Sequence, residues 1–235
     1  MKKVLILILI ILSVVFLGLQ LIQYEAQAAG VRALLMVSLT SLYCLKVSEK
    51  RPFFFLFLIT FTVAEILNFI SWYVDINSES LFDYYYYIGN GLYILSYIFL
   101  IIRVLRDMNL VEVIKKFPLH ILLLLILDVF FVSIVTDTTQ NKLTRHEYSL
   151  EYFYNAIIML LVTVALINFM YRENKKAMNL LVGSIFIVFS EVVQMAYFYV
   201  AEINILNVLC SIFLILAFLF FYLQANLPVL KERLN

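Results

Sequence analysis

Residues 4–24 read VLILILIILSVVFLGLQLIQY, a stretch without a charged side chain in which nearly every position is apolar. A helix that crosses a bilayer needs roughly 20 mostly apolar residues, because the hydrocarbon core is about 30 Å thick and each residue adds about 1.5 Å. The stretch must be helical in lipid, since a backbone amide left unpaired there costs several kcal/mol. It therefore predicts a membrane-spanning helix.

Further stretches of the same kind follow along the chain. They lie at residues 31–47, 52–74, 84–105, 117–136, 150–170, 178–200 and 204–225. The second span is the shortest and is interrupted by hydroxyl side chains at Ser38, Thr40 and Ser41. The sequence thus predicts an all-α fold, a single integral membrane domain over residues 1–235 built as a bundle of eight transmembrane helices.

The composition excludes a soluble domain. Hydrophobic residues make up 65% of the chain and charged residues only 14%, whereas soluble domains carry about 25% charged residues. A net charge of +1 gives no reason to expect a nucleic acid or another polyanion as a partner. Cys44 and Cys210 fall in apolar segments and are expected to be buried free thiols.

Motifs for metal or cofactor binding are missing from the sequence. His120 and His146 have no cysteine or carboxylate cluster around them, and neither a glycine-rich phosphate loop nor a soluble-hydrolase motif occurs. We therefore expect no metal ion and no organic cofactor.

The first apolar run also has features of a secretory signal peptide. Lys2 and Lys3 precede it, and Ala26-Gln27-Ala28 follows it like a cleavage site. The run extends for about 19 residues, whereas the hydrophobic region of a signal peptide has roughly 7–15. We therefore expect an uncleaved first span.

Basic residues occupy every second connection between the spans, and the other connections are acidic or mixed, with Asp75, Glu79 and Asp83 in one of them. The basic residues are Lys2, Lys3, Lys46, Lys50, Arg51, Arg103, Arg106, Lys115, Lys116, Arg172, Lys175, Lys176, Lys231 and Arg233. Because basic connections remain in the cytoplasm, the pattern predicts an even number of spans with both termini cytoplasmic, in a bacterial inner membrane.

The third and seventh spans resemble each other. Residues 63–68, VAEILN, align with residues 189–194, FSEVVQ, and both spans end in Tyr-Val. The offset of 126 residues corresponds to four helices, so the two segments run in the same direction. This predicts two four-helix halves related by an axis along the membrane normal, with chance similarity as the alternative.

The alignment places Glu65 and Glu191 at nearly equal depth in the bilayer, and Asn68 and Gln194 lie about one turn further on the same helix faces. A charged side chain at mid-membrane costs at least ~2.5–3.5 kcal/mol, so each glutamate is expected to have a functional or structural role that offsets this cost. Two carboxyls in one dry cavity cannot both ionise cheaply, which leaves a neutral acid beside a carboxylate. That pair suits proton donation and water activation. The alternative is two protonated glutamates that serve only helix packing.

Other polar residues fall inside the spans or at their ends. Asp128 and Tyr97 lie near the middle of the fifth and fourth spans. Arg32 is expected at the outer start of the second span, as an interfacial anchor or as a grip for a lipid phosphate. The tyrosines at 84–87 open the fourth span, where they predict an aromatic belt, with substrate stacking as the alternative.

These motifs resemble the YhhN-like family of lysoplasmalogenases across nearly the whole chain. Residues 32–36, RALLM, are similar to the family's Lys-Pro-Leu, and Glu65 stands where the family has the aspartate of a Gly-Asp pair. Residues 91–98, GLYILSYI, resemble a glycine-rich segment that leads to a histidine. Residues 183–191, GSIFIVFSE, resemble the signature Gly-Ala-x-x-Phe-x-x-Ser-Asp. Both family aspartates are glutamates in this chain, and Tyr97 replaces the histidine.

The resemblance implies a lipid hydrolase that cleaves the vinyl ether of a lysoplasmalogen or of a related single-chain ether lipid, so a membrane lipid or lysolipid is the expected partner. The implied catalytic residues are Glu65, Glu191 and Tyr97, and the implied substrate-binding residues are Arg32, Asn68 and Gln194. Because the family's polar positions are substituted, two alternatives stay open. One is a non-catalytic subunit with a membrane-protein partner or a small-molecule transporter, and the other is proton or ion conduction through the paired carboxyls.

Overall fold

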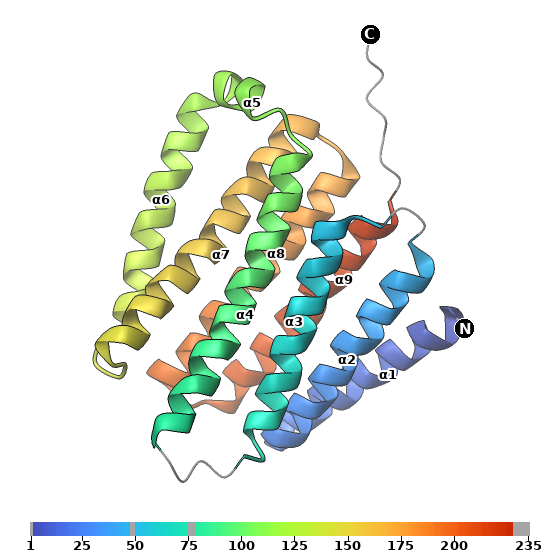
Figure 1. Cartoon of the computed structure of the whole chain (residues 1–235), viewed down its shortest axis with the longest axis vertical. Helices are drawn as coiled ribbons and strands as arrows, with labels where there is room; N and C mark the ends of the chain where they lie inside the picture. The colour runs from blue at the N-terminus through green and yellow to red at the C-terminus, as the bar shows by residue number, and fades with distance from the viewer. Residues whose placement is uncertain (1, 48–49, 75–78, 228–235) are drawn as a thin grey trace.

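The computed structural model describes residues 2–47, 50–74 and 79–227, and within these ranges the chain is helical without a strand (Figure 1). The elements are α1 (Lys2–Leu21), α2 (Glu25–Lys46), α3 (Pro52–Ser71), α4 (Glu79–Arg106), α5 (Leu110–Lys116), α6 (Pro118–Asp137), α7 (Arg145–Arg172), α8 (Lys175–Met195), the π-helical turn η1 (Ala196–Val200) and α9 (Asn204–Asn226). The predicted all-α fold is confirmed.

In this described part of the chain, 8 helices are long and apolar enough to cross a membrane. Helix α5, with 7 residues, is too short, and η1 continues α8 so that the two form one span, Lys175–Val200. The chain is an integral membrane protein, and the predicted number of spans is confirmed. The short helix α5 was not predicted.

The second span is longer than the hydropathy of the sequence indicates. Helix α2 begins at Glu25 rather than at residue 31 and has 22 residues. Its first turns are rich in alanine, which favours a helix but adds little hydropathy, so a search for apolar runs misses them. Ala28 and Ala29 are buried. At Gly30 the ring of Phe69 lies 2.8 Å from where a Cβ would stand, so a larger residue there would require the Phe69 side chain of α3 to shift.

Helix α7 also begins earlier than predicted, at Arg145 rather than at residue 150. The hydroxyl of Thr144 accepts a hydrogen bond from the backbone N–H of Glu147, and the Glu147 carboxylate accepts one from the backbone N–H of Thr144. This capping box starts the helix in a polar segment that hydropathy does not detect. The helix ends where Glu173 takes the left-handed conformation, with φ of 47°.

The two halves of the bundle pack their helices in the same order. Helix α1 packs on α2, α2 on α3 and α3 on α4, and likewise α6 on α7, α7 on α8 and α8 on α9. The halves meet where α4 packs on α7 and α1 packs on α9. This order agrees with the proposed internal repeat, but unrelated helices joined by short connections pack in the same order. The repeat therefore stays a prediction.

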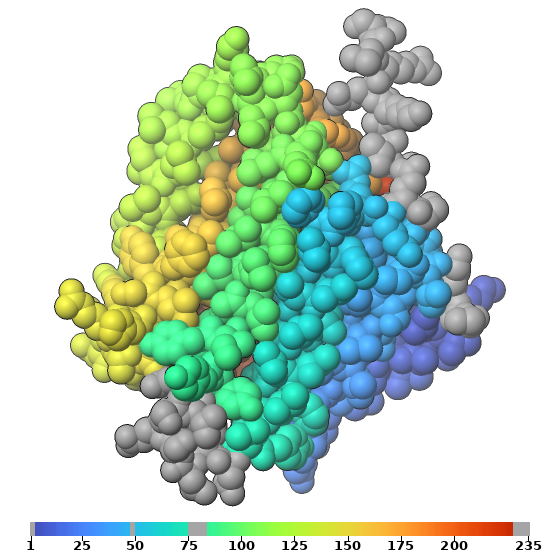
Figure 2. Space-filling view, in the orientation of Figure 1, coloured from blue at the N-terminus to red at the C-terminus, as the bar shows by residue number. Residues whose placement is uncertain are grey.

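Helices α1 and α6 stand at opposite edges of the bundle, and Figure 2 shows α3, α4 and α6 on one face (Figures 1 and 2). The most apolar window of α1 is only 11% buried, and that of α6 only 17%. Large apolar side chains such as Leu119, 73% exposed, therefore face outward. In a membrane these surfaces are covered by lipid rather than by protein.

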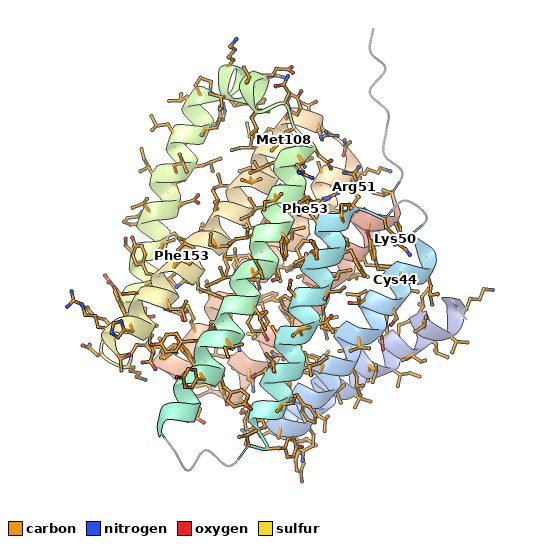
Figure 3. All side chains as sticks on the ribbon, in the orientation of Figure 1. Cys44, Lys50, Arg51, Phe53, Met108 and Phe153 are labelled. Carbon is orange, nitrogen blue, oxygen red and sulfur yellow. The ribbon has the colours of Figure 1, made fainter. Side chains whose placement is uncertain are left out.

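Aromatic side chains fill the middle of the bundle between α3 and α9, in the space that Figure 3 shows occupied by side chains. The ring of Phe57 stacks on Phe218 at 5.9 Å and meets the edge of Phe221 at 5.5 Å. The ring of Phe61 meets Phe218 at 4.7 Å. All four are buried. We name these four phenylalanines the aromatic layer.

The basic connections lie at one end of the bundle, which we name the basic end. There α3 begins after Arg51 and α4 ends at Arg106, as Figure 3 shows for Arg51 and the nearby Met108. The opposite end, where α3 ends and α7 begins, is named the acidic end. Predicted determinants outside the described residues are Asp75, Lys231 and Arg233, together with the side chains of Lys2, Glu79 and Asp83.

Candidate functional site

A cavity of about 580 Å³ opens at the acidic end of the bundle. Every membrane-spanning helix except α6 contributes to its lining, because α6 packs mainly on α7 at the edge of the bundle. Lining residues at the mouth include Trp72 and Phe198, which are 49% and 58% exposed. Phe61 of the aromatic layer also lines the cavity, so this layer separates it from the basic end.

Glu65 of α3 is held by an ion pair inside the bundle. Its Oε2 lies 2.5 Å from Nε of Arg32 on α2, and the two side chains are 1% and 14% exposed. Tyr93 of α4 lies close to the same carboxyl. The sequence placed Arg32 at the outer start of its span, but α2 begins at Glu25, so Arg32 lies about two turns inside the helix. Its expected place at the outer surface is therefore wrong.

Glu191 of α8 has hydroxyl groups as its partners. The phenol of Tyr97 on α4 donates a hydrogen bond of 2.7 Å to Oε1 of Glu191, and the hydroxyl of Tyr154 on α7 lies close to the same carboxyl. Tyr97 is completely buried and Tyr154 is 6% exposed. Two rigid aromatic side chains thus fix the Glu191 carboxyl, while its remaining exposure is toward the cavity it lines.

The two predicted glutamates belong to one site. Both line the same cavity, and the Glu191 carboxyl lies within electrostatic range of both Arg32 and Glu65. Tyr93 stands within range of both carboxyls. The pair therefore has one member beside a cation and one member beside neutral hydroxyls. Charges at such a site interact more strongly than in water, because the surrounding helices exclude solvent.

Two further carboxyls that were not predicted as site residues line the cavity. Glu25 at the start of α2 accepts hydrogen bonds from the Tyr197 hydroxyl at 2.6 Å and from Nδ2 of Asn207 at 3.1 Å. Glu151 of α7 is 7% exposed and accepts a hydrogen bond of 3.3 Å from the Tyr86 hydroxyl. The offset of 126 residues that relates Glu65 to Glu191 also relates Glu25 to Glu151. Extending that alignment beyond the third and seventh spans would have found both.

The remaining predicted residues divide between the cavity and the rest of the bundle. Asn68 and Gln194 line the cavity, but in the described part of the chain Arg32 is the partner of Glu65 and the Tyr97 hydroxyl is the donor to Glu191. Asp128 lies apart from the site, where it accepts a hydrogen bond of 2.8 Å from Thr163 and joins α6 to α7.

The tyrosines at 84–87 have different surroundings. Tyr85 and Tyr86 line the cavity, whereas Tyr84 is 64% exposed, as expected for an aromatic belt. Among the residues that the structure describes, no three metal-ligating side chains lie together, and both cysteines are free thiols.

Comparison with known proteins gives no match: no family model, no curated protein and no solved structure matches this chain. The resemblance to the YhhN-like family therefore stays a prediction from the motifs.

Proposed function

We propose that the protein is an intramembrane hydrolase that cleaves the vinyl ether of a single-chain ether phospholipid. The observation that carries this proposal is the unlike surroundings of the two carboxyls in one cavity, with Arg32 beside Glu65 and tyrosine hydroxyls beside Glu191. A carboxylate beside a carboxylic acid is the arrangement that acid–base hydrolysis requires. The motif resemblance to lysoplasmalogenases agrees with it.

The chemistry assigns a different task to each carboxyl. Glu191, which has no cation of its own, carries the proton and transfers it to the enol-ether carbon that is not bonded to oxygen, which leaves an oxocarbenium ion. Glu65, paired with Arg32, acts as the carboxylate that stabilises this cation and takes a proton from the attacking water. The hemiacetal then breaks its C–O bond to give a fatty aldehyde and the glycerophospho alcohol. Transfer of the proton from Glu65 back to Glu191 restores the site.

The charge of the cavity selects the lipid head group. Among the residues that the structure describes, its lining holds four carboxyls, Glu25, Glu65, Glu151 and Glu191, against one cation, Arg32, which is engaged by Glu65. We therefore assign Arg32 to Glu65 and not to a lipid phosphate. A head group with an ammonium ion fits the spare carboxyls Glu25 and Glu151, and the aromatic rings at the mouth suit a cation as well. The exposed side chains of Trp72 and Phe198 at the mouth suit an alkenyl chain that remains in lipid while the head group enters the cavity.

The test is aldehyde release by the purified full chain in lipid nanodiscs. The substrate is a 1-alkenyl lysophosphoethanolamine, and its 1-alkyl analogue, which has no vinyl ether to protonate, is the substrate control. A coupled dehydrogenase reports the aldehyde. We expect release with the alkenyl lipid alone, and a loss of about 10²-fold or more in Glu191→Gln and in Glu65→Gln.

Asp128→Asn is the matched control, because it neutralises a carboxyl inside the bundle but outside the cavity. It should retain aldehyde release. Intact vinyl-ether lysolipids after incubation with wild-type protein, whether their head group is choline, ethanolamine or phosphate alone, would contradict the proposal. Equal activity of Glu191→Gln and wild type would contradict the assignment of the acid.

The surplus of carboxyls favours a second candidate, transport of protons or of a small organic cation. It predicts a pH-dependent flux into liposomes that Glu25→Gln and Glu151→Gln reduce. Liposomes that show no flux of protons or of tetraalkylammonium ions would remove this candidate and leave the hydrolase.

A further inference from the structure

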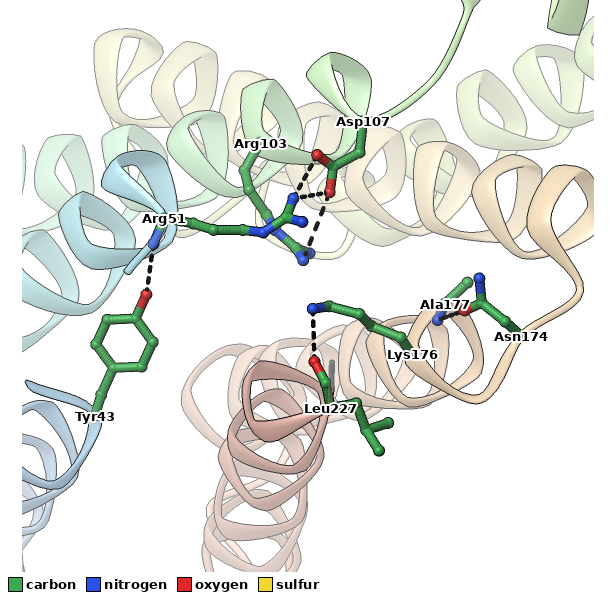
Figure 4. A network of polar contacts seen from close by, with 8 residues as sticks. All are labelled: Tyr43, Arg51, Arg103, Asp107, Asn174, Lys176, Ala177 and Leu227. Atoms are coloured by element: carbon green, nitrogen blue, oxygen red, sulfur yellow. Dashed lines mark hydrogen bonds and ion pairs between the residues drawn. The ribbon is translucent and has the colours of Figure 1, made fainter. Parts of the chain in front are cut away.

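A second cavity, of about 280 Å³, lies at the basic end of the bundle on the other side of the aromatic layer. Four helices and the residue after α9 meet there (Figure 4). Arg51 precedes α3, Arg103 lies in the last turn of α4 and Asp107 follows it, Arg172 ends α7, and Lys176 lies in the first turn of α8. The cavity is distinct from the site described above, because the two share no lining residue.

The charges of the described residues in this cavity do not balance. Among them, the lining carries five cations, Arg51, Arg103, Arg172, Lys175 and Lys176, and one acid, Asp107. Both carboxylate oxygens of Asp107 are taken up by Arg51, and one of them also lies 3.8 Å from Arg103 (Figure 4). Lys176 is within electrostatic range of Arg51, Arg103 and Arg172, so the cations repel one another. One acid cannot neutralise this group.

Several buried polar atoms in the cavity also lack a partner. Arg103 is only 6% exposed and Asn168 only 5%, and both line the cavity. Nε of Arg103, Nε of Arg172 and Oδ1 of Asn168 are buried without a hydrogen-bond partner in the described part of the chain. A buried polar group without a partner costs about 1–3 kcal/mol, and more when it is charged. These atoms therefore indicate a ligand that supplies acceptors to the arginines.

Topology alone does not explain the cluster. The rule that basic connections remain in the cytoplasm requires only exposed lysines and arginines near the helix ends, such as the exposed Lys115 on α5. It does not require Arg103 to be buried over the ring of Phe54, at 5.9 Å, in the lining of a cavity. Burial of a cation is expensive unless an anion accompanies it.

We propose that the basic cavity binds a phosphate group. Arginine presents a planar fork of donors that matches phosphate oxygens in pairs, and two partly satisfied arginines face this cavity. The start of α8, where Asn174 and Lys175 line the cavity, adds the positive end of a helix to the site, and the Ala177 N–H there donates to the capping Oδ1 of Asn174. Asn168 accepts a hydrogen bond from a hydroxyl on or beside the phosphate. The volume accommodates one phosphate with a small substituent, either the head group of a lipid or a water-soluble phosphate.

The experiment uses the full chain, purified in detergent, with probes that separate the two sources. Binding of inorganic phosphate and of glycerol 3-phosphate is measured by calorimetry, and binding of phosphatidic acid is measured by native mass spectrometry against diacylglycerol, which has the same tails but no phosphate. We expect the phosphate-bearing probes to bind and diacylglycerol not to bind. Saturation by the soluble probes identifies a water-soluble ligand, and retention of phosphatidic acid alone identifies a lipid head group.

The variant Arg172→Gln should weaken binding of the probe about tenfold or more, since a hydrogen bond to a charged group contributes about 1.5–3 kcal/mol. Arg172 is only partly buried and ends its helix, so its replacement keeps the bundle intact, and Lys175→Gln on the rim serves as a second variant. Lys115→Gln removes one charge at the same end outside the cavity and should change binding less than about twofold. Absence of binding to every phosphate probe, or equal weakening by Arg172→Gln and Lys115→Gln, would overturn the proposal.

Discussion

Replacement of Glu65 by glutamine should destabilise the protein, because it leaves the guanidinium of Arg32 inside the bundle without its counter-ion. The two charged atoms lie 2.5 Å apart, and the side chains are 1% and 14% exposed. Removal of one partner of a buried ion pair costs about 3–5 kcal/mol. Since Arg32 retains contact with the cavity, we expect a loss near the lower limit, about 3 kcal/mol. Replacement of both partners, Arg32→Met with Glu65→Leu, should cost much less, since no charge is then left unpaired.

Thermal unfolding in detergent measures both effects. For a chain of this size, a loss of about 3 kcal/mol lowers the midpoint by roughly 6–12 °C. Asp128→Asn, which weakens one hydrogen bond to Thr163, should lower it by no more than a few degrees. The single variants Arg32→Met and Glu65→Leu complete the comparison. If the loss of stability in the double variant equals the sum of the losses in these two, Arg32 and Glu65 act independently and the reasoning is refuted. The double variant also separates folding from chemistry, because it should be folded and unable to release aldehyde.

Tyr97→Phe removes the 2.7 Å hydrogen bond to Glu191 and should reduce both stability, by about 1–3 kcal/mol, and aldehyde release. Tyr43→Phe, which removes a 3.0 Å hydrogen bond with the backbone N–H of Arg51 at the basic end, should reduce stability alone, so equal activity losses in the two variants would contradict the site. Gly183→Ala should destabilise the bundle by about 1–3 kcal/mol, since its Cβ would lie 2.6 Å from the buried Phe221 ring, whereas Gly91→Ala, with no atom within 4 Å, should be neutral or stabilising when both are compared by thermal unfolding. A C-terminal fusion should make green fluorescent protein fluoresce and leave periplasmic alkaline phosphatase inactive, and the opposite pair of results would reverse the predicted cytoplasmic location of the termini.

The sequence predicts the spans well because each span lies in lipid along its whole length, where it needs apolar side chains and a helix that pairs every backbone group. The predicted helix starts are wrong where they depend on packing or on a side-chain cap rather than on hydropathy. The start of α2 depends on the packing of alanines and Gly30 against α3, and the start of α7 depends on the capping box at Thr144. Neither contributes to the hydropathy of a window, so both helices begin before their predicted first residue.

The candidate site is partly predictable for a similar reason. Glu65 and Glu191 stand out because a carboxyl within an apolar run needs an explanation. Glu151 escapes notice because it lies in a polar segment at the start of its helix, and the tyrosine partners of Glu191 escape it because aromatic residues are common in membrane helices. Which side chain faces which neighbour depends on the rotation of each helix, and a single sequence does not specify that rotation. The pairing of Arg32 with Glu65 is a contact of this kind.

The aromatic layer is an apolar barrier to any charge that crosses the bundle. Phe57, Phe61, Phe218 and Phe221 are buried between a polar cavity at one end and a basic cavity at the other, so a charge that moves from one cavity to the other has to pass four rings. A charge that crosses the whole potential gains or loses about 2.3 kcal/mol per 100 mV. The proposed hydrolysis moves protons only within one cavity, so its rate should not change with voltage. The rate of transport of a cation past the four rings would depend steeply on the membrane voltage.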